Sequence, residues 1–143
     1  MSPLSDIGHV IQLAIAPVFM LTAIGTVLNV LAARLGRAVD RRRVLVATMP
    51  TLTGETAATA QLEIDFEIRR IRIIFHAMTA SVISAVLVCA LISLAFIDPF
   101  VGIDLAKPVA ALFILSMLAL LASLGLFLRE ILLSLNSPRA PVL

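Results

Sequence analysis

Three long apolar runs dominate the chain, and none of them contains Asp, Glu, Lys or Arg: residues 10–33, 73–97 and 109–128. At about 1.5 Å per residue, helices over these runs would measure roughly 36, 37 and 30 Å. A hydrocarbon core is about 30 Å thick, so each run is long enough to cross it once. The pattern predicts three transmembrane helices.

The composition agrees with this pattern. Of the 143 residues, 61% are hydrophobic and 14% are charged, and the mean hydropathy is +1.11. Soluble domains are closer to half apolar and a quarter charged. These values exclude an ordinary soluble globule, and we expect residues 1–143 to form a single membrane domain with the lipid bilayer as its main partner.

The basic residues indicate the orientation of the chain. Eight of the eleven lie between the first two runs: Arg34, Arg37, Arg41, Arg42, Arg43, Arg69, Arg70 and Arg72. Loops rich in Arg stay in the cytoplasm. This places the N-terminus outside and the C-terminus inside, in agreement with Arg129 and Arg139 after the third run. Because these Arg residues follow the first run, we interpret that run as a retained anchor and not as a cleaved signal.

The segment between the first two runs is predicted to be helical. Leu28, Leu31 and Leu35 keep a helical spacing, which predicts that the first helix continues beyond the membrane. We expect this helix to end near Pro50, because proline disfavours a helical conformation in the residue before it. Residues 51–54 form a turn, and a second helix begins near Glu55. Residues 62–69 alternate apolar and charged residues, as a strand does, but a lone strand has no partner here.

We therefore predict an all-α membrane protein with a cytoplasmic helical hairpin over residues 34–72. Two pairs at helical separation support the hairpin, Asp65 with Arg69 and Glu67 with Arg70. Its charges are open to three interpretations: ion pairs between the two helices, contact with anionic lipid head groups, or solvated charge that only fixes topology. The Arg residues lie at membrane boundaries without interleaved aromatics, so we expect no nucleic-acid partner.

The outer connection, residues 98–108, is short. Asp98 and Pro99 are expected to end the second span, Gly102 to permit a turn, and Asp104 to cap the last helix. That helix is predicted to end at Arg129 and Glu130 or slightly later. This loop is too small for a binding domain.

The first helix carries a stripe of small and polar residues on one face. Its members recur at steps of three and four, and we call them the α1 stripe: Thr22, Gly25, Thr26, Asn29, Ala33, Gly36 and Asp40. Such residues are the usual contact surface of membrane helices. They are also typical of a pore lining, because intramembrane polar groups face a bundle interior or water. Both hypotheses stay open, and packing is the more ordinary one.

The second run has a ladder of small residues at four-residue steps: Ala77, Ser81, Ala85, Cys89 and Ser93. Five matches in succession indicate a helix interface, within one chain or between copies. The third run is more uniformly rich in leucine, and we expect it to face lipid. Two separate small-residue faces predict a homo-oligomer.

The sequence contains little evidence of a catalytic or metal-binding site. His9 and His76 are predicted at opposite membrane surfaces, and no HExxH or GxSxG motif accompanies them. Cys89 is the only cysteine and has no partner for a disulfide. We expect no enzyme activity, no cofactor and no metal site. A non-catalytic structural or interaction protein and an oligomeric ion channel lined by the first helix are the two functional hypotheses.

Four sequence stretches carry a family resemblance: residues 16–19 (APVF), 28–30 (LNV), 34–41 (RLGRAVDR) and 127–130 (FLRE). With them the chain resembles the bacterial membrane family known as domain of unknown function 2721, over nearly its whole length. The resemblance implies three spans in a bacterial inner membrane. It implies no activity, because the family has none assigned.

Overall fold

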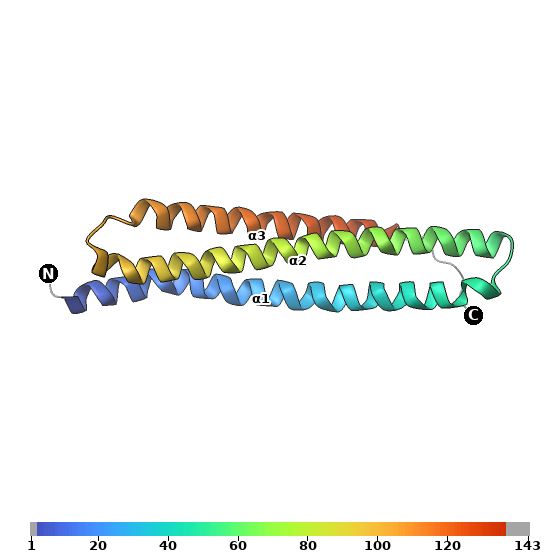
Figure 1. Ribbon diagram of the computed structural model, residues 1–143, viewed down its shortest axis with the longest axis horizontal. Helices are drawn as coiled ribbons and strands as arrows, with labels where there is room; N and C mark the ends of the chain where they lie inside the picture. The colour runs from blue at the N-terminus through green and yellow to red at the C-terminus, as the bar shows by residue number, and fades with distance from the viewer. Residues whose placement is uncertain (1–2, 137–143) are drawn as a thin grey trace. The chain divides into compact units, whose positions relative to one another are not determined.

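The computed structural model describes residues 3–136, with no account of the side chains of residues 3–6 and 10. The described chain consists of helix α1 (Pro3–Thr48), a short 3-10 turn η1 (Met49–Thr51), helix α2 (Glu55–Val101) and helix α3 (Ala106–Leu135) (Figure 1). The prediction of an all-α chain is confirmed, and residues 62–69 are helical. Arg139 and the other residues after Asn136 lie outside the described residues.

The three long helices are apolar enough, by length and composition, to cross a membrane, with mean hydropathies of 2.0, 2.6 and 2.5 over their most apolar windows. Helices α1 and α2 extend well beyond the first two apolar runs, as the helical hairpin requires. Gly54, with a φ of 63°, makes the turn before α2, and Gly102, with a φ of 65°, makes the turn before α3. Helix α2 continues through Pro99 to Val101 and so ends slightly later than expected.

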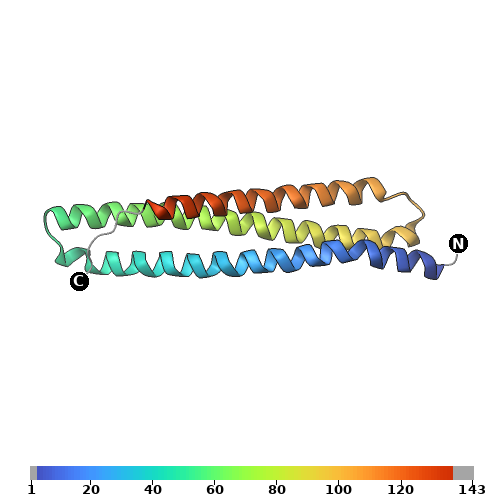
Figure 2. The ribbon, with the colours of Figure 1, turned by 180° about the vertical axis from the view of Figure 1, so that it is seen from behind.

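Contacts divide the chain into two compact units, and all three helices contribute to each. We call Met1–Leu28 with Thr79–Ala122 the apolar unit, and Asn29–Met78 with Ser123–Leu143 the charged unit. The α2–α3 turn belongs to the apolar unit and the α1–α2 turn to the charged unit (Figure 2). The expectation of a single domain over residues 1–143 stays a prediction.

A seven-residue repeat determines which side chains are buried. In α1 the buried residues of the described part are Pro17, Ile24, Leu31, Ala38 and Leu45. In α3 they are Ser116, Ser123 and Glu130. A seven-residue repeat keeps one narrow seam of each helix against its neighbours. The seam of α1 is almost wholly aliphatic, whereas every buried residue in the described part of α3 is polar.

Candidate functional site

A buried carboxylate joins the three helices of the charged unit. Glu130 of α3 is 0% exposed, and its Oε2 lies 2.8 Å from Arg34 Nη1 of α1. Its Oε1 accepts two hydrogen bonds from Arg70 of α2, from Nη2 at 2.8 Å and from Nε at 3.1 Å. Hydrogen bonds between such charged groups are stronger than bonds between neutral groups. Glu130 of α3 therefore forms ion pairs with both of the other helices, α1 and α2.

Arg70 also serves a second carboxylate, Glu67, one turn earlier on α2. Its Nη1 lies 3.1 and 3.2 Å from the two Glu67 oxygens, which confirms the predicted pair. Burial is the largest influence on Glu67 and raises the pKa of its carboxyl, although Arg70 lowers it in part. Burial would lower the pKa of Arg70, but its bonds to Glu130 and the charge of Glu67 outweigh burial and raise it. Arg70 thus gives its best donors to Glu130, and Glu67 is the weaker partner.

A second ion pair links α1 and α2 nearer the hairpin turn. Arg41 Nε donates to Glu63 Oε1 over 2.7 Å, and the Glu63 side chain is 3% exposed. The interpretation of the hairpin charges as ion pairs between helices is supported at this position. The other predicted pair does not form, because Asp65 is exposed and accepts from Gln61 Nε2 at 3.2 Å and not from Arg69.

Arg34 has an additional contact with α3. Its guanidinium carbon lies 5.3 Å from the centre of the Phe127 ring, within the range of a cation–π interaction. Arg34 directly follows the first apolar run, Arg70 precedes the second, and Glu130 follows the third. The network thus lies where the three apolar runs end.

The other Arg residues of the hairpin are exposed: Arg37, Arg42, Arg43, Arg69 and Arg72. Among them only Arg43 has an ion pair within residues 3–136, at 4.0 Å from Asp40, and both side chains of that pair are about three quarters exposed. The other four are exposed and have no ion pair within residues 3–136, so the hairpin combines paired and unpaired charge.

All seven residues of the α1 stripe are exposed in the single chain. By the helical repeat they lie on the side of α1 opposite the buried seam. Thr22 and Thr26 satisfy their hydroxyls within the helix, on the carbonyls of Val18 and Thr22 at 3.4 and 3.1 Å. The Asn29 amide makes no hydrogen bond within the described chain. The α1 stripe therefore does not form a continuous contact surface with α2 or α3.

The α2 ladder changes from buried to exposed along its length. Ala77 and Ser81 are buried, Ala85 is intermediate, and Cys89 and Ser93 are exposed. A step of four residues drifts around a helix with 3.6 residues per turn, so one ladder cannot stay on one face. Its first members face the other helices, and Ser123 of α3 donates to the Ala77 carbonyl at 2.8 Å.

Two contacts between helices go beyond what the sequence patterns predict. Ser84 donates to the carbonyl of Ser116 at 2.8 Å, and Ser116 belongs to the polar seam of α3. Glu130, which the sequence marks only as an end of the last helix, anchors the ion-pair network. The seven-residue spacing of Ser116, Ser123 and Glu130 is the signal that could have revealed both. The burial of these three residues shows that one side of α3 packs against protein, so the expected lipid-facing surface is limited to the rest of that helix.

These features define a class: an all-α protein with three helices long and apolar enough to cross a membrane, joined by buried ion pairs where their apolar runs end. The chain belongs to the family described as Protein of unknown function (DUF2721), whose sequence profile matches residues 14–140. Comparison with curated proteins and with solved structures gives no match.

Proposed function

We propose that this chain is a non-catalytic protein of the bacterial inner membrane that assembles with copies of itself through the α1 stripe. The observation that carries the proposal is the exposure of all seven stripe residues while the opposite side of the same helix is buried. Small residues let helix backbones approach closely, and a polar side chain in hydrocarbon gains by finding a partner on another helix.

Asn29 gives this assembly a specific contact. The carboxamide has both donors and acceptors, so two Asn29 side chains can pair reciprocally across a two-fold axis. Within the membrane such a bond contributes about 1 kcal/mol or less, and close contact of the neighbouring Gly25, Thr26 and Ala33 supplies the remainder.

The orientation follows from the charges. The unpaired Arg residues of the hairpin favour the cytoplasm, where they also meet anionic lipid head groups, and the N-terminus then lies outside. A membrane-impermeant maleimide tests this in intact cells that produce a Cys89→Ser background. Asp104→Cys in the outer connection should be labelled and Thr53→Cys in the hairpin turn should not. The reverse pattern would overturn the orientation.

Neighbouring alanines on α1 test the interface. Ala32 and Ala33 are both exposed, but only Ala33 belongs to the stripe. In the Cys89→Ser background, Ala33→Cys should form cross-linked dimers in native membranes under mild oxidation, whereas Ala32→Cys should stay monomeric. Equal cross-linking at both positions, or none at Ala33, would contradict assembly through the stripe.

A second candidate function is an ion channel lined by the same stripe, and the exposed, unbonded Asn29 amide favours it. The two functions differ in what Asn29→Leu changes. In a channel, the substitution should alter ion flux across the liposome membrane, while the dimers cross-linked at Ala33→Cys persist. In an interface, it should weaken cross-linking at Ala33→Cys, and the liposomes should show no flux attributable to the protein.

A further inference from the structure

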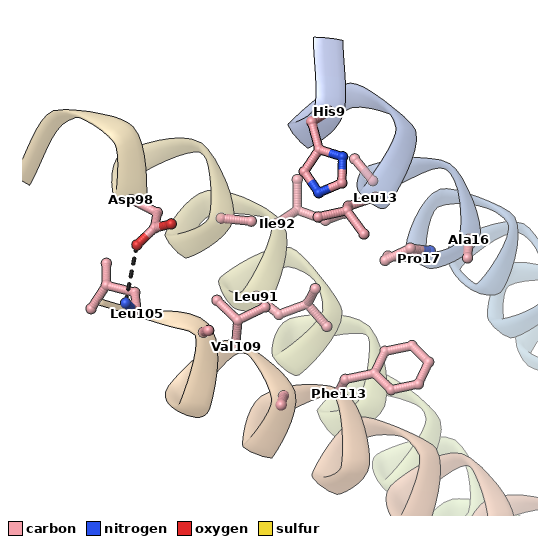
Figure 3. Close-up of a pocket in the computed structure, with 14 residues that line it drawn as sticks. His9, Leu13, Ala16, Pro17, Leu91, Ile92, Asp98, Leu105, Val109 and Phe113 are labelled. Atoms are coloured by element: carbon pink, nitrogen blue, oxygen red, sulfur yellow. Dashed lines mark hydrogen bonds between the residues drawn. The ribbon is translucent and has the colours of Figure 1, made fainter. Parts of the chain in front are cut away.

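The apolar unit contains a pocket of about 560 Å³, lined by residues from all three helices (Figure 3). Twelve of its fourteen lining residues are apolar, and the other two are His9 of α1 and Asp98 of α2. Phe113 of α3 lies further in, away from the α2–α3 turn. The volume falls within the roughly 300–1,000 Å³ typical of small-molecule pockets, and an apolar lining with few polar groups is their usual composition.

The α2–α3 turn holds Asp98 in place at the polar end of the pocket. Its Oδ1 accepts from the backbone N–H of Leu105 at 3.0 Å, as Figure 3 shows. Its second oxygen has no hydrogen-bond partner within residues 3–136. A half-buried carboxylate fixed by one oxygen leaves the other available to a donor on a ligand.

Two prolines remove backbone donors from helix turns next to the pocket. Pro17 and Pro99 lie inside α1 and α2 and have no N–H to donate to the carbonyl four residues earlier. Those carbonyls belong to Leu13 and Ala95, and both residues line the pocket. The helix turns that line the pocket therefore contain two carbonyls without their usual backbone donor.

The charge near the α2–α3 turn also favours a ligand that donates hydrogen bonds. The described connection between α2 and α3 carries Asp98 and Asp104 against Lys107. A carboxylate with a spare oxygen at the pocket, as in Asp98, is complementary to a cationic group with several N–H donors. A lipid with a primary ammonium head group combines that group with an apolar chain that fits the rest of the pocket.

We propose that the pocket binds a phospholipid of the ethanolamine type, with one acyl chain among the apolar residues and the ammonium on Asp98. His9 lies on the opposite wall, where its ring meets the phosphate. This inference rests on the proposed membrane insertion, and choline lipids serve as the comparison because their quaternary ammonium has no N–H to donate.

The absence of Trp and Tyr from the chain gives a direct assay. Phe113→Trp places a single fluorophore in the pocket, and Ile114→Trp places one at the neighbouring exposed position outside it. Each full-length variant is reconstituted into vesicles containing equal small fractions of brominated phosphatidylethanolamine or brominated phosphatidylcholine in an unlabelled phosphatidylglycerol background. Bromine quenches the indole only at close range, so quenching reports which lipid occupies the site.

The expected result for the Phe113→Trp variant is a preference of about tenfold for the ethanolamine lipid, as gained from one hydrogen bond to a charged group. The Ile114→Trp variant should be quenched equally by both lipids. Asp98→Asn keeps the acceptor for Leu105 but removes the charge, so adding it to Phe113→Trp should abolish the preference. Asp104→Asn, outside the pocket, should leave the preference intact.

Filling the pocket provides an independent measurement. Ala110 lines the pocket and its neighbour Ala111 does not. In the Phe113→Trp background, Ala110→Phe should reduce quenching by the ethanolamine lipid, and Ala111→Phe should not. Both replace an exposed alanine of α3, so they share any general cost of the larger side chain.

The remaining outcomes separate this proposal from the one on which it rests. Equal quenching of the Phe113→Trp variant by both lipids, with the Ile114→Trp variant also quenched, would overturn the lipid site and leave membrane insertion standing. A preference that survives Asp98→Asn would also overturn the site. So would shielding of the fluorophore at position 113 that grows with protein density, because a second copy would then fill the pocket. No quenching at either position would overturn insertion itself.

Discussion

The two units use the same three helices but hold them together differently. In the apolar unit Ser84 of α2 donates to the carbonyl of Ser116 of α3, which is a neutral contact, and a pocket of about 560 Å³ stays open. In the charged unit, Glu130 and Glu63 are buried against arginines from other helices. Ion pairs are located where the proposed bilayer ends and water can hydrate the exposed parts of the arginines. Neutral contacts suffice where hydrocarbon makes an unpaired charge too costly.

The sharpest test of this comparison is Glu130→Gln. The substitution keeps the shape of the side chain but leaves Arg34 and Arg70 without their shared counter-charge. Breaking a buried pair costs about 3–5 kcal/mol, so we expect a loss of that order in the free energy of unfolding. Reversible unfolding in mixed micelles measures it, with the exposed Glu55→Gln as control. A loss as small as that of the control would mean that the network does not hold the charged unit together.

In the apolar unit, Ser84→Ala should have a smaller effect. It removes one neutral hydrogen bond to a buried carbonyl, which contributes about 1 kcal/mol to the free energy of unfolding. Ser93→Ala is the matched control, because Ser93 is exposed and bonds only to the Cys89 carbonyl of its own helix. The same unfolding assay applies. If Ser84→Ala cost as much as Glu130→Gln, the contrast between the units would be wrong.

The smallest effect is expected at Glu67. Its folded-state pKa is raised above that of the unfolded chain, so the native state binds more protons in the window between the two values. Stability should therefore rise slightly as the pH falls through the raised pKa towards the ordinary value.

Glu67→Gln should remove that rise and cost little at neutral pH, because Arg70 keeps its bonds to Glu130. Unfolding measured from pH 7 to 5 in both chains, with Arg41, Glu63, Arg70 and Glu130 unchanged, gives the difference. A stability that falls towards pH 5 only when Glu67 is present would contradict the sign of the shift.

Much of the fold follows from local patterns in the sequence. The apolar runs give three helices, and Pro50 with Gly54 gives the hairpin turn, because these signals act over a few residues. The Glu67–Arg70 pair is also local. The predicted pair of Asp65 with Arg69 does not form, so helical spacing alone is insufficient to predict an ion pair on an exposed face.

The long-range contacts are harder to predict. Arg34 and Glu130 are separated by 96 positions, and the positive-inside rule already explains Arg34 as a topology signal. The pocket has no signal in the sequence either, because it depends on how three helix segments separate near the α2–α3 turn. The exposure of the α1 stripe follows only once the opposite seam of α1 is known to be buried.

The shared carboxylate of Glu130 also has a consequence for biosynthesis. The ribosome makes Arg34 and Arg70 well before it makes Glu130, so during insertion of the first two spans both arginines lack the counter-charge of that residue. In the proposed topology, their positive charge first retains the hairpin in the cytoplasm. When the third span has crossed, Glu130 arrives and neutralises the same residues inside the protein. The positive charges of Arg34 and Arg70 thus act first in setting the orientation and later in a structural contact, which forms only after Glu130 has been synthesised.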